Sequence, residues 1–483
     1  MVTLDPNGFA PLTAVVELSA VVPVSVDIEV LGADPLAHAF LRVDSVQSFP
    51  VLGLYAGTDN RVVVTVTEPG VRIASDTLVV TTLPLPESFP AITVQSAQHS
   101  SMEDGLTIAS FSAADGGTFA SWPFAFDANG DIRWYLDLSR FDDTVFGVEP
   151  LANGNLVTAY GRSIYELDLL GRTVREWTIP GYWYHHDVIE LPNRNLLVAV
   201  AKDGPPTIDD HIIEIDRATG VVVNEWDLRQ VLDVDRRDFL GNATDWLHMN
   251  AIWYDERDDT IIVSGRNQGI AKVTRNNELV WILAPHRGWG AAGPEGDGFD
   301  TADFLLIAVD AQGVPYTDDI QQGTSAAADF DWVWGQHAPM LLPNGNLLVF
   351  DNGVNRNFGS APLFSRGVEY TIDEDAMTVR QVWSYGEQRG ADYYSSIISD
   401  VDYLPRTGNR LIAPGFIDDG AGPPTAYVTE VDPDRGDVIF DARIDMKNLA
   451  STGSGWGQFD IVYRAERMRL YPRYSWSSGR GVR

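Results

Sequence analysis

Short apolar runs and turn-forming residues alternate along almost the whole chain. Residues 14–18, 24–30 and 62–67 are rich in β-branched residues or alternate apolar and polar positions, as strands with one buried face do. Asn-Gly, Asp-Gly, Gly-Asn and Pro-Asn pairs separate such runs, and the sequence has no long amphipathic helical pattern. The pattern therefore predicts an almost entirely β protein.

The pattern changes near residue 82, which predicts two domains. Residues 1–82 contain several alternating strands, and a stretch of this kind suits a small β-sandwich. Residues 83–98 begin with a segment of closely spaced prolines, which favour an extended linker. Residues 99–483 follow as one large repeat domain.

A unit of about 40 to 60 residues recurs six times in this second domain. Each unit runs from a turn of the Asn-Gly-Asn type, through an apolar strand and a strand ending in Ile-Asp or Leu-Asp, to a strand with a tryptophan. A unit of this length has room for four strands. Six such units predict a six-bladed β-propeller, whose closure removes exposed sheet edges. The closing tryptophans include Trp134, Trp177, Trp226, Trp281 and Trp383.

Three histidines fall at the same point of three repeats. His186, His248 and His337 each lie six positions before the residue that opens a turn, in a chain with 8 histidines among 483 residues. Equivalent positions in a repeat protein occupy equivalent places in space, so we expect the three rings to meet at the central channel. The same alignment puts Arg266 beside them, and Asn250 follows His248 by two residues.

This cluster is rich in hydrogen-bond donors and nucleophilic nitrogen. The Arg266 guanidinium matches an oxyanion, while a neutral imidazole offers a lone pair and a charged one offers two donors. Transfer of a sulfuryl or phosphoryl group therefore suits the cluster, because one histidine can carry the group covalently while the others hold its oxygens. Trp122, Phe146 and Ser399 occupy the equivalent position in the other three repeats. The two aromatic residues predict an apolar side of the channel that suits a flat aromatic substrate.

Other functions fit the same residues. Three imidazoles suit zinc, iron or copper, so a metal-dependent enzyme is the strongest rival. No acidic ligand stands in register and Arg266 would repel a divalent ion, so we expect no metal and no other cofactor. His185 should face away from His186, because adjacent strand residues point to opposite faces. A sulfatase and a non-catalytic propeller that binds phenolic or sulfated ligands also remain open.

Composition and charge indicate which classes of partner the protein can bind. The net charge is −34, which disfavours binding to nucleic acid and to anionic membranes. The sequence contains no apolar run of 18 residues, so we expect no membrane span. Cysteine is absent, which excludes disulfides, zinc–thiolate sites and cysteine nucleophiles. Small molecules are therefore the expected partners.

Motifs spread over nearly the whole chain are similar to those of the bacterial aryl-sulfate sulfotransferases, the arylsulfotransferase family that does not use the nucleotide sulfate donor. Two are the most specific: Phe-Asp-Trp-Val-Trp-Gly-Gln-His at 330–337 and Phe-Asp-Asn-Gly at 350–353. The other matching segments are residues 4–14, 52–58, 185–187, 245–251, 264–266, 365–373 and 463–467.

The resemblance implies a six-bladed propeller with an N-terminal β-sandwich, a periplasmic or secreted setting and a homodimer. It also implies ping-pong transfer of a sulfuryl group from a phenolic sulfate ester to a phenolic acceptor, through a sulfohistidine. The family's sulfated histidine matches His337, its supporting histidines match His248 and His186, its anion-binding arginine matches Arg266 and its asparagine matches Asn250. This cysteine-free chain lacks the disulfide that better-known members have near the site.

Overall fold

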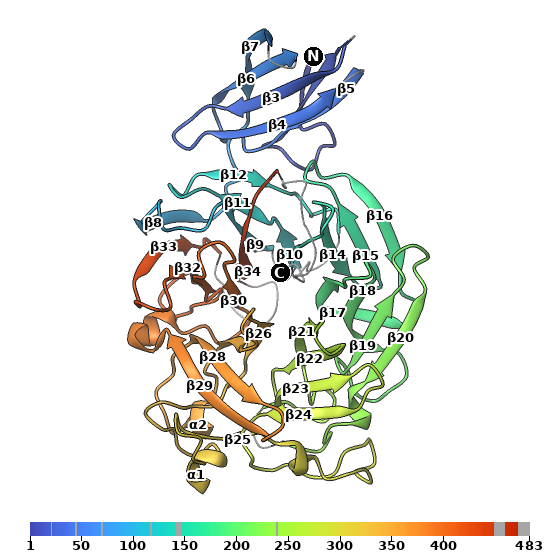
Figure 1. Cartoon of the computed structure of the whole chain (residues 1–483), viewed down its shortest axis with the longest axis vertical. Helices are drawn as coiled ribbons and strands as arrows, with labels where there is room; N and C mark the ends of the chain where they lie inside the picture. The colour runs from blue at the N-terminus through green and yellow to red at the C-terminus, as the bar shows by residue number, and fades with distance from the viewer. Residues whose placement is uncertain are drawn as a thin grey trace.

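The protein is almost entirely β, as the sequence pattern predicts (Figure 1). The computed structural model describes residues 1–20, 22–43, 46–68, 71–115, 118–141, 147–237, 240–448 and 459–471. The helical elements are short: α1 (Asp318–Gln321), α2 (Arg356–Gly359) and 3₁₀ turns at Leu228–Gln230, Thr301–Phe304 and Glu387–Tyr393. No helix within these ranges has the length and apolar character needed to cross a membrane.

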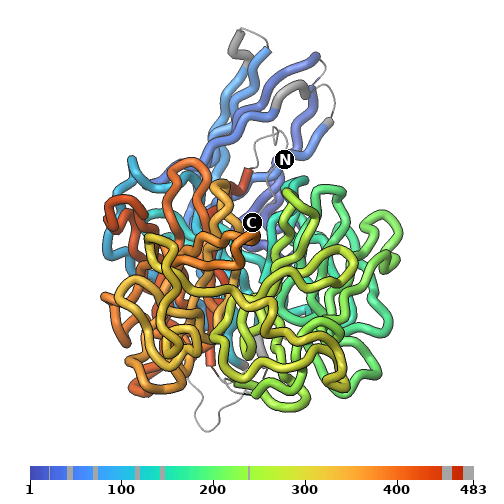
Figure 2. Tube along the Cα trace, turned by 60° about the horizontal axis from the view of Figure 1, so that its bottom comes forward, coloured from blue at the N-terminus to red at the C-terminus, as the bar shows by residue number. Residues whose placement is uncertain are grey.

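Two antiparallel sheets form the N-terminal part of the chain. One joins β1 (Val2–Leu4), β2 (Ala14–Ser19) and β5 (Val46–Val51), and the other joins β4 (Leu36–Val43), β3 (Val24–Val30), β6 (Asp59–Glu68) and β7 (Val71–Thr81). Strand alternation explains the core, since Val24, Val26, Ile28 and Val30 of β3 are buried and the residues between them are less so. Figure 2 shows this part projecting from the larger body.

Six further sheets follow, most of them wholly antiparallel. The first contains β10 (Thr118–Ser121), β9 (Leu106–Asp115), β11 (Phe124–Phe126), β12 (Ile132–Tyr135) and β34 (Ile461–Met468). The second contains β13 (Glu149–Pro150), β14 (Leu156–Tyr160), β15 (Ser163–Leu167) and β16 (Thr173–Thr178). The third contains β17 (Tyr182–Glu190), β18 (Leu196–Lys202), β19 (His211–Ile215) and β20 (Val222–Asp227).

The last three sheets repeat the same order of strands. The fourth contains β21 (Met249–Asp255), β22 (Thr260–Gly265), β23 (Gly269–Thr274) and β24 (Leu279–Leu283). The fifth contains β26 (His337–Leu341), β27 (Leu347–Asp351), β28 (Arg366–Asp373), β29 (Thr378–Tyr385) and the parallel strand β25 (Ile307–Ala308). The sixth contains β30 (Asp400–Tyr403), β31 (Arg410–Ala413), β32 (Thr425–Val431), β33 (Val438–Asp445) and β8 (Ala91–Ala97).

Two strands join parts of the chain that are far apart in sequence. β34, near the C-terminus, pairs with β9 in the first sheet, and β8 pairs with β33 in the sixth. Residues 91–97, which we expected in the linker, therefore form a strand of the sixth sheet.

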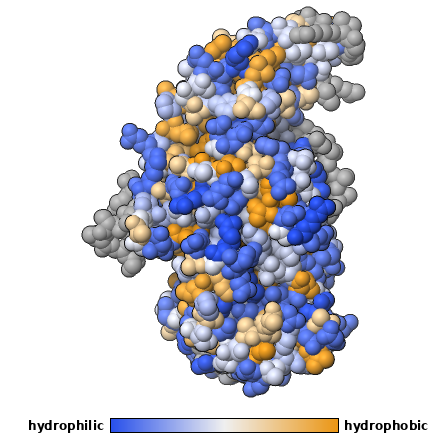
Figure 3. All heavy atoms as spheres, turned by 90° about the vertical axis from the view of Figure 1, so that its left-hand side faces the viewer, coloured by the Kyte–Doolittle hydropathy of each residue, from blue (hydrophilic) through white to orange (hydrophobic). Residues whose placement is uncertain are grey.

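Figure 1 shows the six sheets set around a common centre, with β17, β21, β26, β30 and β34 near it. On the face shown in Figure 3, hydrophilic residues surround scattered apolar ones.

The repeated tryptophans connect each sheet to the next one. Each of four indoles donates its Nε1 proton to a residue at or just after the end of the third strand of the following sheet. The four bonds run from Trp134 to the Leu169 carbonyl (2.8 Å), from Trp177 to the Arg217 carbonyl (3.0 Å), from Trp226 to the Thr274 carbonyl (3.0 Å) and from Trp281 to the Glu374 carboxylate (2.9 Å). The tryptophan period in the sequence thus reflects a contact between neighbouring sheets.

Candidate active site

The three histidines lie on or directly before the inner strands of three neighbouring sheets. His186 is in β17, His248 directly precedes β21, and His337 begins β26. The pairing register of each inner strand shifts beside its histidine. The backbone enters the left-handed region there, with φ of 63° at His186, 50° at His248 and 49° at Ala338. Bulges of this kind re-aim side chains and are frequent beside active sites.

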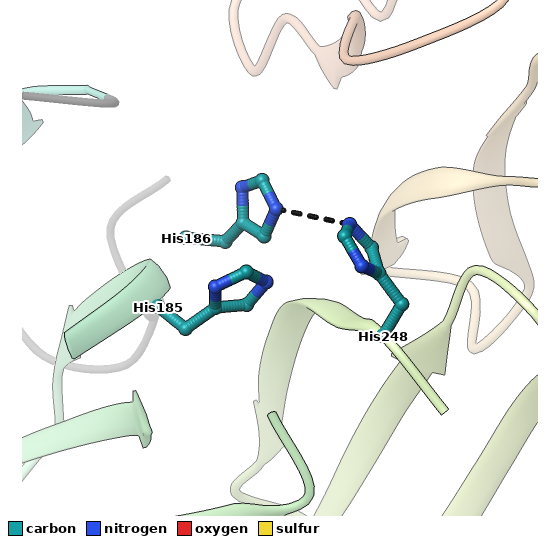
Figure 4. Close-up of side chains that lie close together, drawn as sticks. All are labelled: His185, His186 and His248. Carbon is teal, nitrogen blue, oxygen red and sulfur yellow. Dashed lines mark hydrogen bonds between the residues drawn. The ribbon is translucent and has the colours of Figure 1, made fainter. Parts of the chain in front are cut away.

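His186 and His248 meet through their outer ring nitrogens. Their Nε2 atoms lie 3.3 Å apart, as the dashed line in Figure 4 marks. Nδ1 of His248 donates to the Asp245 carboxylate at 2.8 Å, and Nδ1 of His186 lies 2.9 Å from the Tyr463 hydroxyl. Tyr463, His186, His248 and Asp245 therefore form one continuous hydrogen-bonded chain.

His185 lies with this pair, so the prediction that it faces the other way is wrong. Adjacent residues point to opposite faces only in a regular strand, and the left-handed backbone at His186 breaks the alternation. The rings of His185 and His186 are 4.0 Å apart between centres, and one nitrogen of each of the three histidines lies within 4.8 Å of the others. Figure 4 shows the three rings converging.

His337 is held in one tautomer by Asn352. The Asn352 amide nitrogen donates to the carbonyls of Ser395 and Ile398, both at 2.9 Å, which turns its Oδ1 toward His337. That oxygen lies 2.7 Å from Nδ1 of His337 and can only accept, so Nδ1 carries a proton. Nε2 of the buried, neutral His337 ring therefore keeps a lone pair.

The surroundings favour the neutral form of two of these rings. Burial lowers the pKa of His337 well below its ordinary value of 6.5, and the positive charge of Arg266 lowers it too. Burial, together with the neighbouring histidines, also lowers the pKa of His186 well below 6.5. His186 therefore interacts electrostatically with His248 and His337, and His337 interacts with Arg266.

Arg266 and Asn250 are neighbours of His248 in the fourth sheet, one across the strand pair and one two residues further along β21. The backbone N–H of Arg266, just after β22, donates to the His248 carbonyl at 3.0 Å, and its guanidinium donates to the Ser396 carbonyl at 3.5 Å. Burial lowers the pKa of Arg266. Asn250 is fully buried, and its amide donates to the Gln336 carbonyl at 2.7 Å. Asn250 therefore supports the backbone before His337, and its contact with substrate stays a prediction.

Two carboxylates that the sequence analysis did not single out lie behind the histidines. Asp245 accepts from His248, and Asp209 lies 3.3 Å from Nδ1 of His185. Burial raises the pKa of Asp209 to about 8, and the nearby charges of Asp245 and Asp210 raise it as well. Asp245 begins the motif at 245–251 and lies three positions before His248. This spacing is the sequence signal that could have identified it as a site residue.

The prediction that Trp122 lines an apolar side of the channel is wrong. Trp122 stacks on Phe89, with ring centres 5.3 Å apart, in the core shared with the N-terminal sheets. The reason is that β34, and not a strand near residue 122, lines the inner side of the first sheet. Phe146 lies outside the described residues. β34 instead brings Tyr463 to His186, across 277 residues of sequence that no local pattern could connect.

A buried ion cluster underlies these histidines. Arg464 of β34 pairs with Asp187 at 2.9 Å and also with Glu149. The second oxygen of Asp187 accepts from the backbone N–H of Ile252 at 2.8 Å. These bonds join inner strands of four neighbouring sheets, so Asp187 fixes the backbone beside His186.

Ser399, the remaining register position, is also used structurally. Its hydroxyl donates to Ser395 Oγ at 2.8 Å and accepts from the Gly415 backbone N–H at 3.0 Å, while its own N–H donates to the Tyr463 carbonyl at 3.2 Å. Ser399 thus ties the sixth sheet to β34 next to the histidines.

Together these groups can hold an anion and offer it a nucleophile. Arg266 supplies a positive charge, His248 with Asp245 behind it forms an acid–base pair, and His337 presents a lone pair on Nε2. The nitrogens of His185, His186 and His248 are also close enough to share a metal ion.

Comparisons with known proteins give the family. The family described as Arylsulfotransferase (ASST) matches residues 91–456, and the Arylsulfotransferase Ig-like domain matches residues 1–83. Arylsulfate sulfotransferase AssT of Escherichia coli O6:H1 is 31% identical, and the protein of the same name from Lelliottia amnigena is 30% identical. Each of these two alignments covers 83% of this chain and 82% of the relative.

Likeness to solved structures is weaker. A protein of unknown function from Bacteroides caccae is 12% identical and aligns with a TM-score of 0.44, over 75% of this chain and 98% of that chain. That value carries no argument about function, so the assignment depends on the matches in sequence. The chain belongs to the arylsulfotransferase family and is a transferase of sulfur-containing groups.

Proposed function

We propose that this protein moves a sulfuryl group from a phenolic sulfate ester to a phenolic acceptor by a ping-pong mechanism, with His337 as the nucleophile. The observation that carries the proposal is the orientation of Asn352, whose Oδ1 accepts from Nδ1 of His337 at 2.7 Å. A histidine fixed in this tautomer directs the Nε2 lone pair away from Asn352, where a sulfur atom can be attacked. The lowered pKa of His337 keeps that lone pair available at neutral pH.

In the first half-reaction, Nε2 of His337 forms a bond to sulfur while the bond between sulfur and the aryl oxygen breaks. The phenolate oxygen leaves with the electron pair of that bond and takes a proton from His248, whose charged form Asp245 stabilises. Arg266 and His186 bind the sulfonate oxygens. In the second half-reaction, the acceptor phenol gives its proton to His248, and its oxygen takes the sulfuryl group from His337.

We propose the following architecture and setting for this activity. The six sheets are the blades of a β-propeller that begins with β8 at residue 91, where we had expected it to begin at residue 99, preceded by a β-sandwich over 1–82 and a connecting segment over 83–90. The pairing of β34 with β9 and the indole bonds between sheets support a closed ring. Family membership supports small aryl sulfates and phenols as substrates. The periplasmic or secreted location and the homodimer are proposed from the resemblance alone.

Replacement of the nucleophile tests the proposal. His337→Asn should reduce p-nitrophenyl sulfate turnover to background, because the ring that carries the sulfuryl group is lost. The control is His99→Gln, a surface histidine, which should keep full activity. Circular dichroism and thermal melting check that both variants fold. Retention of more than a few per cent of activity by His337→Asn would remove His337 from this role.

Phenol release without an acceptor separates the rival functions. Transfer through a covalent enzyme predicts a burst of one phenol per active site and then very slow release. A sulfatase predicts continuous release, since water serves as acceptor. A receptor that only binds sulfated ligands predicts saturable binding and no phenol at all.

A further inference from the structure

We propose that His185, His186 and His248 form a binding site for one zinc ion, and that zinc bound there blocks the proposed transfer reaction. The second part rests on the proposed function, because it assigns His186 and His248 to the sulfonate. The first part depends only on the geometry of the three rings (Figure 4).

The spacing of the ring nitrogens fits tetrahedral zinc. Zinc–nitrogen bonds of about 2.0–2.1 Å place two ligand nitrogens of a tetrahedron about 3.3–3.4 Å apart. Nε2 of His186 and Nε2 of His248 are already 3.3 Å apart. His185 supplies the third nitrogen within 4.8 Å of the other two, so small ring rotations complete three ligands. Water would fill the fourth position.

Oxygen atoms behind the rings supply the second feature of a histidine metal site. Metal-bound histidines usually donate their other N–H to a carboxylate or another oxygen, which fixes the tautomer and strengthens the ligand. Asp209 lies behind His185 at 3.3 Å, and Asp245 lies behind His248 at 2.8 Å. The Tyr463 hydroxyl lies 2.9 Å from Nδ1 of His186. Each of the three rings therefore has an oxygen behind it.

Zinc binding needs a defined proton arrangement. His248 already has its proton on Nδ1, facing Asp245, so its Nε2 is ready to coordinate. His186 coordinates through Nε2 when its proton is on Nδ1 and the Tyr463 oxygen accepts it, so neutral His186 changes tautomer without losing a proton. The Asp245 carboxylate, which accepts from His248, offsets part of the cation's charge.

Direct binding measurements test the site without any substrate. Equilibrium dialysis of metal-stripped protein against buffered Zn²⁺ should give one tightly bound zinc per chain. Asp245→Asn, which removes a partner behind a ligand and is partly exposed, should weaken binding about 10- to 100-fold, and His185→Gln should weaken it at least as much. His99→Gln is the matched control and should bind like the unchanged protein. Thermal melting without zinc confirms folding.

Two results would overturn the site: absence of tight stoichiometric zinc in the unchanged protein, or unchanged affinity in folded His185→Gln. His337→Asn separates the two proposals, because it should lose turnover and still bind zinc. Zinc should inhibit the unchanged protein in competition with p-nitrophenyl sulfate, and an increase of turnover with zinc would contradict inhibition. If zinc binds as expected but the unchanged protein transfers no sulfuryl group, the proposed function fails and the zinc site stands.

Discussion

The two ends of the inner strands differ in how closely the repeats resemble one another. At the end with the asparagine-rich turns, four sheets repeat one arrangement, in which turn asparagines donate to a buried glutamate that pairs with an arginine of the next sheet. The sets are Glu166 with Asn153, Asn155 and Arg217; Glu214 with Asn193, Asn195 and Arg275; Glu369 with Asn344, Asn346 and Arg410; and Glu430 with Asn409 and Arg467. At the other end, the repeats differ and the histidines gather.

The fourth sheet shows what the turn end preserves. Its buried Lys272 takes the place of the glutamate and pairs with Asp255 at 3.4 Å, Asp258 at 2.5 Å and Glu374 of the next sheet at 2.6 Å. The signs of the charges are exchanged, yet the contact between sheets is kept. Complementary charge, and not a particular residue, is therefore what this end of the repeat requires.

The electrostatic effects at the two ends have opposite signs. Burial raises the pKa of Glu166, but hydrogen bonds from Arg217 and Asn155 outweigh it and leave the pKa below its ordinary value, so the charged form is stabilised. Burial lowers the pKa of His337 and of Arg266, so the charged forms there are disfavoured. We infer that the turn end contributes stability and that the histidine end gives up stability for reactivity.

Breaking an ion pair at the turn end should give the largest effect on folding. Glu430→Gln leaves Arg467 buried without its negative partner, and this should lower the free energy of unfolding by about 3 kcal/mol. Urea unfolding measures the loss. Glu374→Gln is the control, because Lys272 keeps two other carboxylates and Glu374 is partly exposed, so the change should stay within about 1 kcal/mol. Folded Glu430→Gln should turn over at the normal rate; a large fall in kcat with unchanged stability would contradict the division between the two ends.

Removal of the cation at the histidine end should show the reverse pattern. Arg266→Gln should lower kcat/KM for p-nitrophenyl sulfate about 100-fold, because the sulfonate loses its charged partner. Urea unfolding should show stability that is equal or higher, since a half-buried positive charge is removed. Substantial destabilisation with little loss of activity would show that Arg266 stabilises the fold and does not bind the sulfonate.

The pH dependence should give the smallest effect. His337 must be neutral to attack, and its pKa lies well below 6.5, so lowering the pH through 6.5 should not remove its lone pair. The burst rate of phenol release at low donor concentration should therefore not fall between about pH 8 and pH 6. A fall to half near pH 6.5, with the slope of one proton, would indicate an ordinary exposed histidine as the nucleophile.

The features of the fold and the site that depend on the repeat could be predicted from the sequence. The β content, the six units and the register of His186, His248 and His337 all follow from periodic patterns that local chain geometry enforces. Sequence reasoning missed what depends on a break in that pattern or on distant pairing. His185 joins the cluster because the backbone of His186 is left-handed, and Tyr463 reaches it because β34 pairs with β9.

The Asn352 contact was missed for a related reason. Asn352 directly follows β27, as Arg266 directly follows β22, but its role depends on the carbonyls of Ser395 and Ile398 in the loop before β30. Those two acceptors orient the amide, and through it the His337 ring. A sequence pattern records residue types, and the direction of an amide depends on which acceptors the fold places around it.

Mass spectrometry of the protein mixed with p-nitrophenyl sulfate alone directly tests whether His337 carries the sulfuryl group. We expect a gain equal to one SO₃ on the peptide that contains His337, formed with release of one p-nitrophenol and removed when a phenol acceptor is added. A protein that turns over both substrates with no modified peptide, or with the group on a different residue, would contradict it.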